Sequence, residues 1–430
     1  MNVSMKVGSE VLELQLPERH FARHISFAEQ STGERSANEW VQKSVEELRS
    51  SGFFSAARDR IVGLLLADST RERTFEGYLP TLQAAAETAE ELRVFVCTGT
   101  HDPESAENAE LGETLRERLR QLSITATVTV HDARAGDHVH VETTTHGTRV
   151  EFHAAALECE TFLVLANMKV HYFAGYSNPV KYYLPGLCSF ETARSNHSLT
   201  LDERSTFGKH PWHPNPECHD NPLAEDMVDG FELLIGAREH FALTVVGSIE
   251  NPIWCGGGRT EEVAGRAMEV VDRFSRLVVE PSRFLVVSPG GHPHDESLYT
   301  AQRALELTRA AVQSGGEVLF LAACPNGVGS GTARRNFFEP LTRELSEVCR
   351  KPEGEYVMYS HKAYKFGLYL ADLERVHVLS ELPAEELKSI HLAPVSSAQA
   401  VIDEWIGKAG EGDSVTFVDD ASKFALCRKA

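Results

Sequence analysis

The chain is short of positive charge. It holds 42 Lys and Arg against 63 Asp and Glu, which gives a net charge of -21. A surface of this sign repels nucleic acid and anionic membrane surfaces, so neither is an expected partner. A small molecule is the expected ligand.

Long apolar runs and paired cysteines are also absent. No segment approaches the roughly 18 uninterrupted apolar residues of a spanning helix. The start, MNVSMKVGSEVLELQLPE, has no basic flank followed by a long apolar core, as a secretion signal would. The eight cysteines form no CxxC pair, and a chain of this size needs no disulfide staples. We therefore expect a soluble, unprocessed protein with reduced thiols in the cytoplasm.

Short apolar runs alternate with helical patterns in the first part of the chain. The runs predict buried strands at residues 61–67, 94–97, 126–130 and 162–166. Apolar residues at three- and four-residue spacing predict helices at residues 37–50, 82–92 and 111–122. Strands that alternate with helices indicate a mostly parallel sheet. Residues 139–152 change to a period of two and predict a β-hairpin.

The same pattern restarts near residue 281. Strands are predicted at residues 284–287, 318–321, 356–358 and 376–379, with a helix over residues 296–313. A chain of 430 residues is long for one domain, so two are expected. We predict an α/β fold of two domains with mostly parallel sheets and an active site in the crevice between them. The predicted boundaries are 1–275, 276–412 and a tail, 413–430, that could belong to either domain.

Three predicted strands of the first domain end in reactive side chains. The strand at 61–67 leads into Asp68 and Arg71, the strand at 94–97 into His101, and the strand at 162–166 into His171. Ligands of open α/β sheets collect where strands end. Each site alone would more often be a helix cap or an ordinary loop residue. Coincidence at three strand ends favours one shared site.

Residues 171–197 carry the densest group of such side chains. His171, Lys181 and His197 surround the dipeptide Pro185-Gly186. This segment could supply a metal ligand, an amine for covalent attachment and a histidine for proton transfer. It is the strongest indication of an enzyme. The Pro185-Gly186 turn, before a helix expected near Ser189, could also offer backbone N–H groups to a phosphate.

Together these fragments resemble the nickel-dependent lactate racemase family. The resemblance covers most of both domains. It continues in the same order through Glu191-Thr192, Asn196-His197, Asn221-Pro222, Glu225-Asp226, Gly290-Gly291-His292-Pro293 with Asp295, Tyr299, and Cys324 leading to Gly327 and Gly329.

The resemblance implies a nickel-pincer nucleotide, a pyridinium mononucleotide whose ring carbon and two sulfurs bind nickel. His197 matches the protein ligand of the metal. Lys181 matches the lysine that becomes joined to the cofactor, and Asp68, Pro185 and Gly186 are further expected cofactor contacts. Separate biosynthetic proteins would supply the nucleotide.

The implied reaction inverts C2 of a 2-hydroxy acid. His101 or His171 takes the hydroxyl proton while the Cα hydrogen leaves as hydride, and each histidine serves one enantiomer. Arg71 and Arg303 could hold the carboxylate, because a guanidinium fits it bidentately. Tyr299 and Thr300 are the other expected substrate contacts.

The chain departs from the family pattern in two places. Residues 177–180 read Ser-Asn-Pro-Val where the family has small glycines, which leaves covalent attachment at Lys181 open. Tyr-Gln-Ala-x-Lys becomes Tyr299-Thr300-Ala301-Gln302-Arg303. These changes permit lactate or a related acid such as malate, an aryl-lactate or a sugar acid.

Other motifs rank lower. Residues 210–219 contain His210, His213, Cys218 and His219, but three prolines favour a loop near the cofactor over a zinc site. Two alternative functions stay open. One is a racemase that abstracts the Cα proton with two bases and a metal. The other is a non-catalytic cofactor carrier or sensor. The oligomeric state is open between monomer and homo-oligomer.

Overall fold

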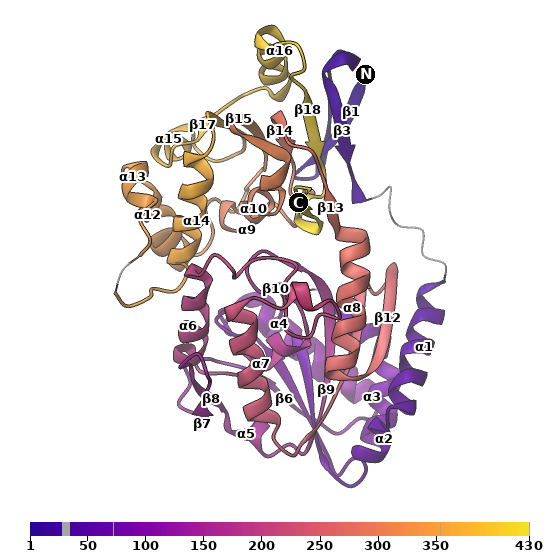
Figure 1. Cartoon of the computed structure of the whole chain (residues 1–430). Helices are drawn as coiled ribbons and strands as arrows, with labels where there is room; N and C mark the ends of the chain where they lie inside the picture. The colour runs from indigo at the N-terminus through magenta and orange to yellow at the C-terminus, as the bar shows by residue number, and fades with distance from the viewer. Residues whose placement is uncertain (28–34, 72, 353, 430) are drawn as a thin grey trace. The chain divides into compact units, whose positions relative to one another are not determined.

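The computed structural model describes residues 1–430 apart from 28–34, 72, 353 and 430. The chain forms two compact units (Figure 1). We call residues 32–272 the central unit. Residues 1–31 and 273–430 together form the terminal unit.

The central unit is built on a mostly parallel sheet. Its strand order is β12-β11-β9-β4-β5-β6, with β10 paired to β9. Only the β11–β12 and β9–β10 pairings in this sheet are antiparallel. The strands are β4 (Ile61–Ala67), β5 (Glu91–Cys97), β6 (Thr127–Val130), β9 (Thr161–His171), β10 (Gly175–Ser177), β11 (Glu239–Gly247) and β12 (Pro252–Arg259). The predicted hairpin is confirmed as β7 (His138–Thr143) and β8 (Arg149–His153), which pair antiparallel.

Helices pack on this sheet. They are α1 (Ala37–Ser50), α2 (Phe53–Ala56), α3 (Leu79–Ala86), α4 (Ala106–Gln121), α5 (Ala154–Leu157), α6 (Phe190–Ser198), α7 (Pro222–Ile235) and α8 (Thr260–Ser275). Helix α1 begins with a capping box between Ser36 and Glu39. It lies alongside β12 (Figure 1). A Cβ at Gly257 would come within 2.0 Å of the Ser44 carbonyl oxygen, so the glycines of β12 permit this close approach.

The terminal unit contains a second, wholly parallel sheet in the order β17-β16-β15-β14-β18-β3. Its strands are β3 (Phe21–Ile25), β14 (Ser282–Val287), β15 (Val312–Leu321), β16 (Arg375–Leu379), β17 (Ala393–Pro394) and β18 (Val415–Val418). The other strands are β1 (Asn2–Val7), β2 (Glu10–Gln15), β13 (Arg276–Val278) and β19 (Ala425–Cys427). The helices are α9 (Leu298–Ala301), α10 (Arg303–Thr308), α11 (Gly331–Ala333), α12 (Glu339–Leu341), α13 (Leu345–Val348), α14 (Ser360–Ala371), α15 (Ala384–Ser389) and α16 (Ala398–Lys408).

The expected α/β fold with mostly parallel sheets is confirmed, but the division of the chain differs at its start. The sequence prediction placed residues 1–31 with the first domain. In the structure they group with residues 273–430, because β3 pairs in parallel with β18. That pairing also places the 413–430 tail in the terminal unit.

Three local predictions are wrong. Helix α3 ends at Ala86, and Glu91 already pairs with Ile61 in β5. The predicted helix over 296–313 breaks into α9, α10 and a short 3₁₀ turn, and Val312 begins β15. Residues 356–358 form no strand, because the chain turns through Tyr359, at a φ of 76°, into α14. Among the helices of the described residues, none combines the length and apolar character needed to cross a membrane.

Candidate active site

Two neighbouring strand ends place an aspartate beside a histidine. Strands β4 and β5 pair in parallel up to Ala67 and Cys97, so the residues that follow them share one edge of the sheet. There, Asp68 Oδ2 lies 2.6 Å from His101 Nδ1. The Asp68 carboxylate accepts the Nδ1 proton, which leaves Nε2 of His101 as the basic nitrogen.

Asp68 is held as the carboxylate. The residue is buried, and burial raises its pKa, but His101, Arg71 and the Thr70 hydroxyl outweigh burial and lower the pKa below its ordinary value of 3.8. Thr70 Oγ1 donates to Asp68 Oδ1 at 2.7 Å. Asp68 is predicted to contact the cofactor. Its hydrogen bond to His101 Nδ1 indicates that it also orients the His101 ring.

Asn108 joins the two loops that carry this pair, and sequence reasoning did not identify it. Its Oδ1 accepts the Ser69 N–H at 3.0 Å, and its Nδ2 donates to the Asp102 carbonyl at 2.8 Å. The residue sits in the first turn of α4 and is buried. An asparagine near a helix start is so common that the sequence offered no signal for this role.

A second group of site residues surrounds the Phe173 ring, just beyond the end of β9. The ring centroids of His171 and His197 lie 4.5 Å and 5.6 Å from that of Phe173. Lys181 Nζ lies 5.5 Å from the same centroid. Asn221 Nδ2 donates to the Phe173 carbonyl at 3.0 Å and fixes its backbone. The three residues predicted from segment 171–197 are thus brought together.

Lys181 stands on a short capped turn. Asn178 caps the 3₁₀ helix Pro179–Tyr182, since its Oδ1 accepts the Val180 N–H at 2.8 Å. Lys181 Nζ lies 3.3 Å from His171 Nε2. Residues 177–180 therefore build a cap that fixes the lysine next to a histidine.

The N–H groups of the Pro185-Gly186 turn, which were predicted to bind a phosphate, are hydrogen-bonded within the protein. Gly186 N donates to the Lys181 carbonyl at 2.9 Å, and Cys188 N donates to that of Pro185 at 3.1 Å. The turn instead ties the two groups together, because Gly99 N donates to the Gly186 carbonyl at 3.2 Å. A Cβ at residue 186 would come within 2.1 Å of the Tyr182 carbonyl oxygen.

His197 is presented by α6 with a defined tautomer. Its Nδ1 donates to the Ala193 carbonyl oxygen at 2.8 Å, so Nε2 carries the lone pair that a metal needs. The preceding Asn196 donates to the buried Asp226 carboxylate at 2.8 Å. Asp226 also accepts from Thr144 and Thr148, which secures this end of α6.

The remaining predicted substrate residues belong to the terminal unit. Tyr299 lies in α9, and Arg303 Nε donates to the Thr300 carbonyl at 3.0 Å. Sequence reasoning missed Lys362, a buried lysine whose Nζ lies 3.3 Å from the Tyr299 ring centroid. It follows no motif, and only the fold brings α14 to α9.

Comparison with known proteins gives one consistent result. A model described as the lactate racemase N-terminal domain matches residues 7–208. The lactate racemase of Thermoanaerobacterium thermosaccharolyticum is 26% identical over 309 residues, which cover 70% of this chain and 69% of that protein. The lactate racemase of Lactiplantibacillus plantarum is 21% identical over 407 residues, covering 92% and 91%.

The fold agrees with these matches. The solved apoprotein structure of the Thermoanaerobacterium thermosaccharolyticum lactate racemase has a TM-score of 0.82 to this chain at 19% identity, and covers 99% of this chain and 100% of that one. A Thermotoga maritima protein of solved structure has a TM-score of 0.61 at 14% identity, over 93% of this chain. The chain is therefore similar to lactate racemases, which are isomerases, over most of its length, and its residues 7–208 match the N-terminal domain model of that family.

Proposed function

We propose that this chain is a racemase or epimerase that inverts the C2 centre of a 2-hydroxy acid, lactate or a related acid, with a nickel-pincer nucleotide. The observation that carries the proposal is the gathering of His171, Lys181 and His197 around Phe173. A metal ligand, an amine and an acid-base group are the chemistry this reaction needs.

The residues fit the cofactor. His197 would hold nickel through Nε2, because Nδ1 is already committed to the Ala193 carbonyl. Lys181 would be the point of covalent attachment. When bound, the nucleotide supplies an acceptor for the Cα hydrogen as hydride.

His101 acts as the base for one enantiomer. Asp68 accepts its Nδ1 proton, so Nε2 takes the hydroxyl proton of the substrate as the Cα hydrogen leaves. Because the pKa of Asp68 is lowered, its carboxylate stays charged. That negative charge stabilises the imidazolium that forms on His101.

His171 has the opposite tautomer to His101. The Ala174 N–H points at its Nδ1 at 3.3 Å, so the neutral ring carries its proton on Nε2. His171 can thus return a proton to the carbonyl oxygen of the 2-keto acid as hydride returns to the opposite face of Cα, after His101 has taken the hydroxyl proton. Lys181 Nζ lies 3.3 Å from His171 Nε2, so the amine that would attach the cofactor is next to this acid-base group.

Arg71 would hold the substrate carboxylate, and Tyr299, Thr300 and Arg303 remain the predicted substrate contacts of the terminal unit. Arg71 follows Asp68 on the same loop, and its backbone N–H donates to the Asp68 carbonyl at 3.1 Å. Thr300 and Arg303 depart from the family pattern, so the acid could be larger or more polar than lactate.

The cofactor is tested by metal analysis and intact mass of the full chain from a host that makes the nucleotide. We expect one nickel per chain and a mass increase that Lys181→Ala abolishes, while the matched Lys209→Ala keeps it. Protein without nickel or nucleotide under these conditions would refute the proposal, including its non-catalytic alternative.

The mechanism is tested by turnover in deuterated water. Hydride return keeps the original hydrogen at Cα, whereas two-base proton abstraction exchanges it for deuterium. Product that retains the Cα hydrogen supports the proposal. Deuterium entering Cα at the rate of racemisation would establish the two-base alternative instead.

A further inference from the structure

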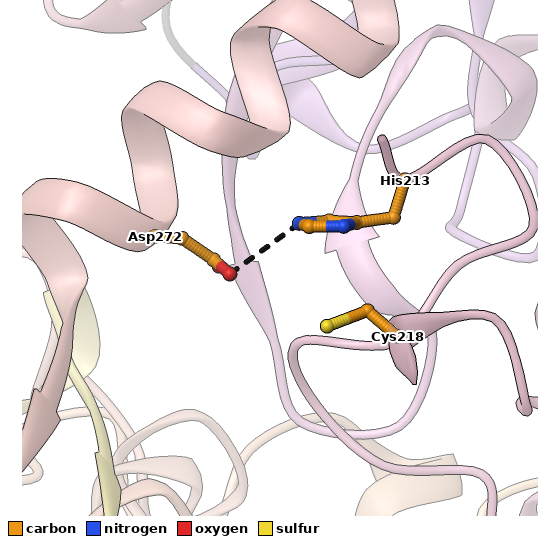
Figure 2. Close-up of side chains that lie close together, drawn as sticks. All are labelled: His213, Cys218 and Asp272. Carbon is orange, nitrogen blue, oxygen red and sulfur yellow. Dashed lines mark ion pairs between the residues drawn. The ribbon is translucent and has the colours of Figure 1, made fainter. Parts of the chain in front are cut away.

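A separate group of metal-ligand side chains lies in the central unit, outside the residues assigned above. It consists of His213, Cys218 and Asp272 (Figure 2). One potential ligand atom from each lies within 4.8 Å of the other two. His213 and Cys218 come from the proline-containing segment between α6 and α7, and Asp272 comes from α8. In Figure 2 the Cys218 sulfur points toward the gap between the His213 ring and the Asp272 carboxylate.

His213 has a buried nitrogen that the described residues leave without a hydrogen bond. The residue is 7% exposed, and its Nε2 is among the buried atoms that find no hydrogen-bond partner in the described part of the chain. This nitrogen lies 3.4 Å from Asp272 Oδ2. Two zinc bonds of about 2.1 Å at a tetrahedral angle separate their ligand atoms by about 3.4 Å, so the spacing matches one edge of a metal site.

The ring and the carboxylate are both held by neighbours. The Asn215 N–H donates to His213 Nδ1 at 3.0 Å, and the Asn215 carbonyl oxygen lies 3.3 Å from the same nitrogen. A metal on Nε2 would shift the ring proton to Nδ1, where that carbonyl oxygen would accept it in place of the N–H contact. Tyr176 Oη donates to Asp272 Oδ1 at 2.5 Å and turns Oδ2 toward the site.

We propose that His213 Nε2, Cys218 Sγ and Asp272 Oδ2 bind a divalent cation of the zinc class. Imidazole, thiolate and carboxylate together form a donor set that zinc accepts in tetrahedral geometry, with water at the fourth position. The site is distinct from nickel binding at His197 and does not depend on the nucleotide.

A cation in this site would steady the strand next to His171. Tyr176 lies in β10, where it pairs with Val170, and its neighbour Gly175 pairs with His171. A cation that fixes Asp272 also fixes the Tyr176 hydroxyl, and with it the strand next to His171. The His213 and Tyr176 rings stack with their centroids 6.0 Å apart, which adds a second connection.

The test uses the full-length chain purified without added metal, in a His197→Gln background that removes the nickel ligand. Titration with Zn²⁺ should give one tight equivalent and raise the melting temperature. Titration with Co²⁺ should give the thiolate-to-cobalt charge-transfer band and the strong visible bands of a tetrahedral site. These spectra need no enzymatic activity.

Variants locate the site. Cys218→Ser should remove the charge-transfer band and the melting-temperature shift, and Asp272→Asn should weaken binding, whereas the control Cys349→Ser should leave both readouts unchanged. Tyr176→Phe, which removes only the outer hydrogen bond, should weaken binding roughly 10- to 100-fold. No equivalent of Zn²⁺ or Co²⁺ bound by the parent, or binding that survives Cys218→Ser with its sulfur band intact, would overturn the proposal.

Discussion

At the scale of single residues, the proposed mechanism depends on the Asp68–His101 pair for the direction of proton transfer. The carboxylate fixes which ring nitrogen is basic, and Asn108 holds the two loops in register. Asp68→Asn keeps the shape but removes the negative charge, so the imidazolium loses its stabilisation. We expect kcat to fall by about 10²- to 10⁴-fold with a small change in KM. The measurement is steady-state racemisation near neutral pH. A rise in KM with kcat unchanged would instead show that Asp68 contacts the substrate in the ground state.

A buried histidine behind the same loop gives a pH prediction. His131 is fully buried, and Thr98, which begins the loop to His101, donates to its carbonyl at 2.6 Å. Burial, reinforced by His138 and His153, lowers the pKa of His131 from 6.5 to about 3. The unfolded chain therefore binds a proton below pH 6.5 that the folded chain excludes, and stability contributed by the neutral ring falls as pH drops from 6.5 toward 3.

The measurement is the melting temperature as a function of pH. Wild-type protein should lose stability across that window more steeply than His131→Asn. Equal slopes for the two proteins would show that His131 is not the group responsible.

At the scale of elements, the Pro185-Gly186 turn connects the two groups of site residues. It receives Gly99 N–H on one side and donates to Lys181 on the other. Gly186→Ala would bring a Cβ within 2.1 Å of a backbone oxygen, so the turn must move and Lys181 with it. We expect a destabilisation of about 1–3 kcal/mol and a loss of activity.

Gly136→Ala is the matched control. It lies in the same unit, and its Cβ would meet no atom within 4 Å. Denaturant unfolding of both variants measures the difference. Equal stabilities for the two would contradict the close approach at Gly186.

Sequence patterns predicted helices and strands well where the local apolar pattern matches the burial of the element in the fold. The run Ile61–Ala67 and the amphipathic helix Ala37–Ser50 have the predicted bounds, because burial alone defines them. The prediction at 356–358 failed because three apolar residues carry no information about a partner strand. The candidate histidines and Lys181 were predictable from a shared motif order. Asp272 and Lys362 were not, since only tertiary contacts bring them to His213 and Tyr299.

At the scale of the whole molecule, the chain starts in the terminal unit, forms the central unit, and ends in the terminal unit. Strand β3 pairs with β18, and Lys6 forms ion pairs with Asp419 and Asp420 at 3.3 Å and 2.6 Å. Removing residues 1–25 should therefore loosen the terminal unit. Hydrogen–deuterium exchange should accelerate in β18 and β14, while β4 and β9 of the central unit exchange as before. Acceleration confined to β4 and β9 would contradict the division of the chain.

The central claim is that His101 and His171 invert a 2-hydroxy acid in a site completed by His197 and Lys181. The most direct measurement offers single enantiomers of lactate, malate and aryl-lactates to nickel-loaded protein and follows the products by chiral chromatography. The account predicts that at least one acid is converted to its opposite hand, and that His101→Gln and His171→Gln each stop this conversion. Inversion at the wild-type rate by the double variant, or no inversion of any acid by nickel-loaded protein, would contradict it.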